Sequence, residues 1–558
     1  MVGSRWAASF ILVVAAATMS SASPVVQVGS ASAAGASLNS NLMTGGGRDD
    51  TAVLQYILDG ARESRPVHLI IDGPALVSGL NVYGNTTVEC LEGAGLYLKD
   101  GSNRAIIRNA HRSREAVTDE HISIRGCILN GNREHQSASN QEEDGTFISG
   151  LQFLGTNHLD IRDVALYDIR SFGIWVANGR FIQIRNVLVD NGSPPYPESS
   201  TPASQYAHIM QYAQSDGIHF NGPIGYLTVD GLNAVNIGDD ALALNANDML
   251  GDDITAQNEM GPYVGQGPIT DVTIRNIVLG EALGGIRLLS RDQRIDRVAI
   301  ENVSGKARSR MLTLGPFVST KNTGNFGAIT VDTVTVQTSK IAPYREIFKA
   351  MTIRFPEEEE YPLFAVNSPI ESLILKNIVV KTSDGRPVIW IGPNADVQAL
   401  SADLHLIDPG LQSMPVRLLN GGHIATLNLQ LDWTGHPVDV GRTPIDNEGA
   451  AIDQLHWVYT PPSYVAAEVR GKDLIVTFSE EVEATDFASG VSVTINGHRI
   501  VVHNPRRLFR RDRVRYELSR SVSPNDIITW GYDAADGNIQ NANGDRLLTV
   551  SAKRATNR

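Results

Sequence analysis

A short unit that recurs along most of the chain limits the folds open to it. Each copy reads apolar, any residue, apolar, then a polar pair that ends in Asn, Asp or Gly. Ile161 and Ile184 in two such copies lie 23 residues apart, and Ile274 and Ile300 lie 26 apart. Repeats of this length are typical of solenoids. Seven copies are clear, at Ile122–Gly126, Leu159–Asp163, Ile182–Asn186, Leu227–Gly231, Val272–Asn276, Val298–Asn302 and Leu373–Asn377.

The pattern inside the repeats predicts an all-β, right-handed parallel β-helix over residues 45–433. Apolar and other residues alternate within short strands, turn residues are frequent, and long helical stretches are few. The alternative is a β-propeller, which needs regular four-stranded blades that the sequence does not show. A repeat array also needs an end cap over its open core. Apolar residues at helical spacing in Asp49–Asp59 predict that this cap is an N-terminal helix.

The start of the chain has the pattern of a signal peptide. Arg5 precedes the apolar run Trp6–Ala17, and small residues follow it. We expect residues 1–34 to form this leader, with cleavage between Ala22 and Ala34. A single membrane anchor is the alternative, but the run is shorter than the roughly 20 residues that span a bilayer. The prediction is a secreted protein, extracellular or periplasmic, with no membrane span after cleavage.

Past Trp433 the repeat fades and a second domain is predicted. Residues 434–462, which include Thr460–Pro462, are expected to be a linker. Short alternating strands and the turn Asn496–Gly497 then predict a small β-sandwich over 463–558. The segments Val476–Glu480 and Tyr532–Asn538 resemble immunoglobulin-like modules of secreted bacterial proteins.

The composition of the chain limits the classes of molecule that it can bind. The chain has 558 residues, 42% hydrophobic and 19% charged, values of an ordinary soluble protein. Its net charge of −14 argues against nucleic acid, and against a strongly anionic polymer unless a local basic patch overrides it. Cys90 and Cys127 are the only cysteines, and the sequence leaves open whether they pair or stay free. No zinc-type Cys/His spacing is present, and we expect neither a cofactor nor a metal.

A second set of strands predicts the floor of a groove. If Ile, Leu, Val and Phe point inward in these strands, one residue of each forms an outward column: Trp175, His219, Ala243, Arg287 and Thr313. Extra residues enter on both sides of the coils that carry His219 and Ala243, in Ser193–Gln214 and Asn247–Gly267. Long loops on a regular scaffold are often binding walls. The alternative is packing against a neighbouring subunit, and the oligomeric state stays open.

Three acids mark the candidate site. Asp216 and Asp240 are 24 residues apart, one coil, and would stack about 4.8 Å from each other, with Asp239 beside them. Like charges this close raise at least one pKa. Simple alternation gives Asp216 and Asp240 the parity of inward residues, so a turn or bulge before each strand must swing them out. The alternative is that these residues cap turns or hold a structural cation.

These motifs resemble glycoside hydrolase family 28, the polygalacturonase-type members of the pectate-lyase-like superfamily, and more loosely a dextranase-like family. Ser215–Gly217 is similar to their Asn-Thr-Asp-Gly motif and Gly238–Asp240 to Gly-Asp-Asp, while Gly285–Leu289 lies where Arg-Ile-Lys belongs. The resemblance implies inverting hydrolysis, with Asp239 as the general acid and with Asp216 and Asp240 positioning and deprotonating the water.

The chain departs from that pattern at two points. No Gly-His-Gly follows, and Leu289 replaces the basic Lys, so the poly- or oligosaccharide substrate need not be acidic. Trp175, His219 and Arg287 are the expected substrate-binding residues; for Arg287 the alternative is an ion pair with the acids. The competing functions are a polysaccharide lyase or epimerase on the same scaffold, which the lack of a lysine disfavours, and a non-catalytic carbohydrate-binding surface protein.

Overall fold

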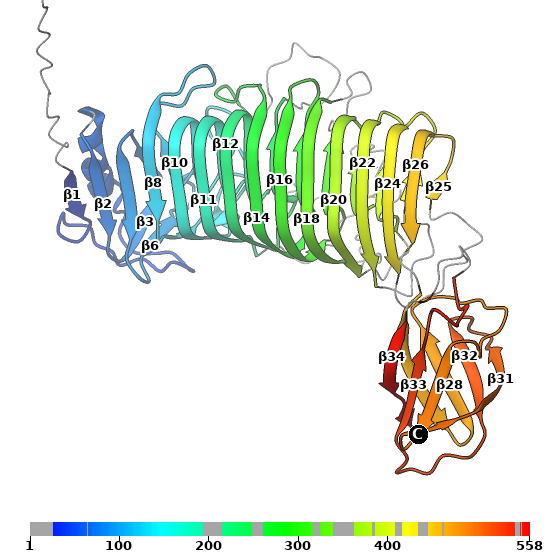
Figure 1. Cartoon of the computed structure of the whole chain (residues 1–558). Helices are drawn as coiled ribbons and strands as arrows, with labels where there is room; N and C mark the ends of the chain where they lie inside the picture. Colours follow the sequence, from blue (N-terminus) through cyan, green and yellow to red (C-terminus); the bar gives the residue numbers. More distant parts are fainter. Residues whose placement is uncertain are drawn as a thin grey trace, which may run out of the picture.

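The chain forms a long β-helix followed by a smaller β unit (Figure 1). The structure is a computed structural model and describes residues 26–63, 65–192, 215–247, 261–307, 309–315, 324–338, 362–381, 386–407, 416–433, 445–459, 462–541, 547 and 549–558. Among these residues, none of the helices has the length and apolar character that crossing a membrane requires.

Each coil of the β-helix pairs with the next through parallel hydrogen bonding, which confirms the parallel β-helix. The first residues of β10 (Leu151–Tyr167) pair with β7 (Ile107–Asn109), its middle with β8 (Asp119–Arg125) and its end with β9 (Ile128–Asn130). A coil therefore has three faces, and the long strands seen in Figure 1 bend from one face to the next.

One face, which we call the site face, carries the candidate residues. It consists of β4 (Leu80–Val82), β7, the starts of β10, β11 (Ile174–Asp190) and β12 (Ile218–Val235), and then β13 (Asp240–Asn245), β15 (Gly284–Leu289), β17 (Leu312–Gly315), β19 (Phe364–Val366), β21 (Ile389–Ile391), β23 (Val416–Leu418) and β25 (Ile445–Asn447). The remaining strands of the earlier coils are β2 (Val67–Ile71), β3 (Pro74–Val77), β5 (Thr86–Cys90) and β6 (Gly95–Leu98). Those of the later coils are β14 (Ile269–Ala282), β16 (Ile295–Ala307), β18 (Phe326–Thr338), β20 (Pro369–Lys381), β22 (Asp396–Leu406) and β24 (His423–Trp433).

The corners of the coils explain why each repeat unit ends in Asn, Asp or Gly. The last residue of all seven units has a positive φ, which these residue types adopt at the least steric cost. The corner side chains also connect neighbouring coils: Asn302 Nδ2 donates to Asn276 Oδ1 at 2.7 Å, and Asn186 Nδ2 to Asp163 Oδ1 at 3.0 Å. The repeat thus reflects two needs of each coil: a residue that tolerates a positive φ at the corner, and apolar side chains that point into the core.

One continuous apolar core fills the helix, and α1 (Thr51–Leu58) closes its first coil, as predicted. Leu54, Ile57 and Leu58 of α1 belong to that core, and the 3₁₀ turn η1 (Asp59–Glu63) follows. The first coil begins earlier than expected, because β1 (Gln27–Ser30) pairs in parallel with β2. The expected leader, residues 1–34, therefore overlaps the folded part, because it includes β1. Residues 1–25 lie outside the described residues. A second 3₁₀ turn, η2, spans Arg133–His135.

The β-helix also ends later than residue 433. β25 pairs with β23, and β26 (Ala451–Tyr459) pairs with β24, so part of the expected linker 434–462 is a further coil. The sequence hides this coil because most of the side chains described in β26 (residues 451–457) are exposed, and of these seven Ile452 and Trp457 pack against the core. Among the described strands β26 pairs with β24 alone, so it does not need full apolar alternation.

The C-terminal unit is a β-sandwich of two sheets over one core, as predicted. A five-stranded sheet has the order β31-β32-β28-β27-β35 and a four-stranded sheet the order β30-β29-β33-β34. Val476, Tyr516 and Trp530 are among the residues they bury together. Asn496 and Gly497, both with positive φ, turn β29 into β30. The strands are β27 (Tyr464–Arg470), β28 (Asp473–Phe478), β29 (Val491–Ile495), β30 (His498–Ile500), β31 (Val502–Arg507), β32 (Arg513–Leu518), β33 (Ile528–Tyr532), β34 (Val550–Arg554) and β35 (Thr556–Asn557).

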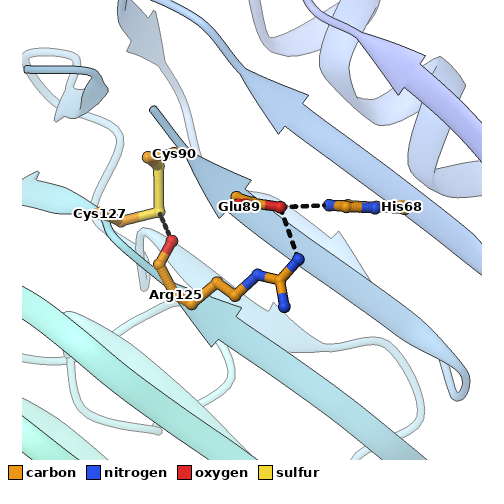
Figure 2. Close-up of a disulfide and its surroundings, with 5 residues drawn as sticks. All are labelled: His68, Glu89, Cys90, Arg125 and Cys127. Carbon is orange, nitrogen blue, oxygen red and sulfur yellow. Dashed lines mark hydrogen bonds and ion pairs between the residues drawn. A yellow bond between two sulfur atoms is a disulfide. The ribbon is translucent and has the colours of Figure 1, made fainter. Parts of the chain in front are cut away.

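A disulfide joins neighbouring coils near the N-terminal end of the helix. Cys90 at the end of β5 bonds to Cys127 just after β8, with their Cα atoms 4.8 Å apart (Figure 2). Beside it, Glu89 accepts from Arg125 at 2.6 Å and lies 2.7 Å from Nε2 of His68, which connects β2, β5 and β8. The hydrogen bond from Arg125 lowers the pKa of Glu89. The pairing that the sequence left open is therefore present.

Removing this disulfide should destabilise the β-helix. It closes a separation of 37 residues, for which the chain-entropy model gives about 4 kcal/mol. We expect the double variant Cys90→Ala, Cys127→Ala to unfold at a clearly lower temperature by circular dichroism. Reduction of the unaltered protein should lower the midpoint by a similar amount, because these are the only cysteines. An unchanged midpoint in both experiments would contradict a stabilising role.

Candidate active site

The expected outward column exists as a register of the site face. Trp175 pairs with His219, His219 with Ala243, Ala243 with Arg287, and Arg287 with Thr313. None of the five belongs to the continuous core of the helix. All five are nevertheless buried, so this face is covered in the structure.

The turns before β12 and β13 bring the three acids together. The amide of Gly217 donates to the carbonyl of Asp240 at 3.0 Å, and the amide of Asp240 donates to Oδ1 of Asp216, also at 3.0 Å. Carboxylate oxygens of Asp216, Asp239 and Asp240 all lie within 4.8 Å of one another. Asp216 and Asp240 are buried, and Asp239 is partly exposed. Oδ2 of Asp216 lies 2.6 Å from His219 and Oδ2 of Asp240 lies 3.9 Å from Arg287, both residues of the outward column, so the turns direct these two carboxyl groups toward that column.

The electrostatics separate the three carboxyl groups. Burial and the neighbouring acids raise the pKa values of Asp216 and Asp239 well above their ordinary value. Burial also raises the pKa of Asp240, but the positive charges of Arg287 and Arg310 oppose that rise. Arg287 also opposes the rise for Asp216, and both arginines oppose it for Asp239, but Asp240 is the carboxyl group that Arg287 approaches, with Nη1 3.9 Å from Oδ2. The negative charge of the cluster is therefore best supported at Asp240.

His219 is a neutral partner of Asp216. Its Nδ1 lies 2.6 Å from Oδ2 of Asp216, and its ring stacks on Phe172 with centroids 4.4 Å apart. Burial lowers the pKa of His219 to about 3, so the ring carries no charge at neutral pH. Within the described part of the chain, its Nε2 has no hydrogen-bond partner. The imidazole thus orients the carboxyl group of Asp216 and leaves its other nitrogen for a ligand or water.

Arg287 and Arg310 supply the positive charge of the site. Nη1 of Arg287 lies 3.9 Å from Oδ2 of Asp240. Arg310 was not identified from the sequence, although it follows the same register as the acids: the amide of Gly285 donates to its carbonyl at 2.8 Å, as that of Gly217 does to Asp240. The signal that could have found it is its position two residues before Leu312 of β17, as Asp216 lies two residues before Ile218 of β12 and Asp240 two residues before Leu242 of β13.

Trp175 lies in the expected column but presents no open ring face. Its side chain is buried, and Nε1 donates to Oδ1 of Asn221 at 2.7 Å. Phe147, Phe172 and Val264 pack around it. Direct stacking on a sugar would therefore require this packing to open. Of the two expected walls, Ser193–Gln214 lies outside the described residues, and so do residues 248–260 of the second wall.

Two groups of side chains have the composition of a metal site. The three acids could hold a divalent cation through their oxygens. The charges of Arg287 and Arg310 beside Asp240 oppose that use, because they already supply the positive charge that a cation would bring. The second group, Glu120, His121 and His158, is exposed, and its two imidazole rings stack 4.6 Å apart.

The comparisons found likeness only among solved structures. No family model and no curated protein matches the chain. A family 28 exopolygalacturonase of Yersinia enterocolitica is 13% identical over 78% of each chain, with a TM-score of 0.40. PfbA, a surface adhesin of Streptococcus pneumoniae, is 12% identical over 80% of this chain and 97% of that one, at 0.43. A tailspike protein of E. coli bacteriophage HK620 is 9% identical over 87% and 89%, at 0.45. Likeness at this level carries no argument about activity.

Neutralising Asp239 should stabilise the protein at neutral pH. A carboxyl group whose pKa is raised by folding contributes stability that is present below its unfolded pKa and lost as the pH rises toward its folded pKa. We expect Asp239→Asn to raise the unfolding midpoint by a few degrees at pH 7 and to change it little at pH 4. The groups facing Asp239 are Asp216, Asp240, Arg287 and Arg310.

Asp230→Asn is the matched control, measured by calorimetry at both pH values. Arg275 and Asn276 lower the pKa of Asp230, so its neutralisation should leave or reduce the midpoint at pH 7. A lower midpoint at pH 7 for Asp239→Asn would contradict the raised pKa of Asp239.

Proposed function

We propose that this protein is a secreted glycoside hydrolase that cleaves a poly- or oligosaccharide by inversion with three aspartates. The observation that supports this most directly is the unequal acid cluster. Asp239 is partly exposed and holds its proton firmly, while Arg287 and Arg310 support the negative charge of neighbouring Asp240. A glycosidase needs such a division, with one carboxyl group as acid and another as base.

In the proposed reaction each carboxyl group has one task. Asp239 donates its proton to the leaving glycosidic oxygen. Asp240 accepts a proton from the attacking water, and Asp216, held by His219 and by the amide of Asp240, orients that water. The bond from the anomeric carbon to the leaving oxygen breaks as the bond to the water oxygen forms. Arg287 binds the substrate or stabilises Asp240, and His219 offers Nε2 to a sugar hydroxyl.

The stereochemical outcome depends on the separation between the acid and the base. Oxygens of the three acids lie within 4.8 Å of one another, whereas inverting enzymes ordinarily separate acid and base by about 6.5–9.5 Å. Proton NMR of the first anomer released tests the point. Release of the inverted anomer is the result that the proposed mechanism requires. Release of the retained anomer, which the short separation favours, would instead make one of the acids a nucleophile and overturn inversion.

Digestion of a glycan panel tests the hydrolase itself. The unaltered protein should release reducing sugars from one class of glycan, and Asp239→Asn should lower that rate by about 10²–10⁴-fold while binding persists. A lyase or epimerase would be indicated by an absorbing unsaturated product or by a changed sugar without cleavage. Binding without any product would indicate a carbohydrate-binding surface protein. An unchanged rate in Asp239→Asn would remove the role assigned to that residue.

Gly284 gives a sharper test of the site geometry. It pairs with Asp240 in the register, and a Cβ at this position would collide with Oδ1 of Asp240. Because that atom ends a side chain, Gly284→Ala should fold with a nearly unchanged midpoint and displace the carboxylate. We expect the hydrolysis rate to fall at least 10-fold, since misplacing a reacting group by about 1 Å can cost about 10²-fold.

Gly285→Ala is the contrasting variant. Its Cβ would meet the carbonyl oxygen of Met311 at 2.5 Å, which is backbone and cannot turn away. This change should lower the unfolding midpoint. Full activity in Gly284→Ala, measured as reducing-sugar release, would show that the Asp240 carboxylate is not needed where the structure has it.

A further inference from the structure

One hairpin of the C-terminal sandwich concentrates positive charge. Residues 506–515 hold six arginines and one acidic residue, a local charge of +5 in a chain whose net charge is −14. The hairpin consists of β31 and β32, at the edge of the five-stranded sheet (Figure 1). A small part of an acidic protein therefore has a field of the opposite sign, and such a field attracts anionic ligands.

Three of these arginines lie together on the outer face of the sheet. Arg513 and Arg515 alternate along β32 with Val514 and Tyr516, which belong to the core, so the two arginine side chains point away from it. Arg506 of β31 lies directly opposite Arg515 in the register, and opposite residues of an antiparallel pair share one side of the sheet. We call these three residues the arginine strip.

Acids balance the strip only in part. Nη2 of Arg515 lies 2.5 Å from Oδ1 of Asp473, whereas none of the described residues forms an ion pair with Arg506 or Arg513. Like charges directly opposite each other in a sheet are destabilising, so the pairing of Arg506 with Arg515 costs stability. An anionic ligand between the two guanidinium groups would remove this repulsion.

Protection of the sheet edge does not explain the strip. Charged side chains on an edge strand prevent it from pairing with another sheet. This role accounts for Arg506, because β31 is the outermost strand of its sheet. It does not account for Arg513 and Arg515, because β32 lies between β31 and β28.

A free aromatic ring lies at the tip of the same hairpin. Phe509 is fully exposed, so both faces of its ring are open to a ligand. Arg510 and Arg511 follow it, and their ion pairs with Asp512 and Glu481 are both 3.5 Å long. Both arginine side chains remain more than half exposed, and exposed pairs of this kind are weak. The two arginines thus remain available to another anion.

We propose that the arginine strip and Phe509 bind an acidic polysaccharide. The planar N–H donors of the guanidinium groups pair with carboxylate or sulfate groups of the polymer. The negative face of the Phe509 ring attracts the C–H groups of a sugar ring. Arg513 and Arg515 lie about 6.8 Å apart along the strand, and Arg506 lies about 5 Å across from Arg515, so one polymer chain can contact all three.

The proposal goes beyond the hydrolase, because this surface belongs to a different domain from the acid cluster. Two other anionic partners fit the surface less well. A membrane gains from Phe509 only if the hairpin enters it end-on, and the face that carries the strip then stands away from the headgroups. Nucleic acid carries more charge per unit length than a polysaccharide with one charge per sugar, so the rest of this acidic chain repels it more strongly.

Three dextrans with one backbone test the proposal on the full chain: neutral dextran, carboxymethyl-dextran and dextran sulfate. By isothermal titration calorimetry at low salt we expect binding of at least one charged dextran, no binding of neutral dextran, and a loss of affinity as salt is added. The charged dextran that binds more tightly identifies the group that the arginines recognise. Binding of neither charged dextran, or equal binding of all three, overturns the proposal.

Phosphatidylglycerol vesicles and single-stranded DNA are the competing ligands in the same titration. We expect both to bind more weakly than the better charged dextran. Tighter binding of the vesicles would make a lipid surface the partner, and tighter binding of the DNA would make it nucleic acid. Either result overturns a polysaccharide as the ligand.

Variants on the full chain test the residues. Arg506→Gln combined with Arg513→Gln should lower the affinity by about 10-fold or more, because two charged hydrogen bonds are lost. Its unfolding midpoint by circular dichroism should stay the same or rise slightly, since Arg506 no longer opposes Arg515. Phe509→Ala should lower the affinity several-fold, and it keeps the test valid if the double variant is destabilised, because the fully exposed ring does not support the fold.

Arg499→Gln combined with Arg554→Gln is the matched control. It removes the same charge from exposed positions of the other sheet, on β30 and β34. The affinity for the charged dextran should change little. An equal loss of affinity in the control and in the strip variant would show that only the total charge matters, and an unchanged affinity in the strip variant and in Phe509→Ala would exclude the hairpin. Either outcome overturns the proposal.

Discussion

The parallel hydrogen bonds between coils are the interaction on which the rest of this structure depends. They place residues about one coil apart in sequence directly over one another, at about 4.8 Å. The bond from the amide of Gly217 to the carbonyl of Asp240 is one of them, and it is enough to put Asp216 and Asp240 in the same position of successive coils. A site of this kind needs no specially shaped loop, because equivalent positions of successive coils already lie in a row.

Burying this row of acids costs folding free energy, and the side chains around it show how that cost is limited. Three acids in a covered site repel one another, and burial favours their neutral forms. Arg287 and Arg310 oppose this for Asp240, whereas His219 stays neutral beside Asp216. The result is a difference between groups of the same residue type, made by surroundings alone. Such differences cluster at functional sites, although ion-pair networks can also produce them.

The sequence predicts the parts of this structure that repeat and misses those that do not. Corner residues such as Asn276 and Asn302 carry a backbone requirement, and alternating apolar residues carry the core, so the parallel β-helix, its cap and the column of Trp175 to Thr313 could be foreseen. The last coil could not, because β26 is exposed and loses the apolar pattern. Arg310 was missed because its importance comes from the register and not from a local motif.

The sequence did not show that Trp175 is buried, and the reason differs from the one for Arg310. Its cover comes from Phe147 and from Tyr263 and Val264, which are distant in sequence and belong to connections without periodicity. Alternation identifies the direction of a side chain but says nothing about what lies above it. For the same reason the sequence showed that Asp216 and Asp240 needed a turn to leave the interior, but could not show that the turns before β12 and β13 provide it.

The 24-residue coil between the acids leaves them insensitive to changes elsewhere in the chain. Connections at the corners can lengthen or shorten without moving Asp216 relative to Asp240, since their spacing is set by the rung between them. The acid cluster and the connections around it are therefore encoded in separate stretches of the gene. A lineage built on such a scaffold can gain or lose loop residues while inheriting the spacing of the three aspartates unaltered.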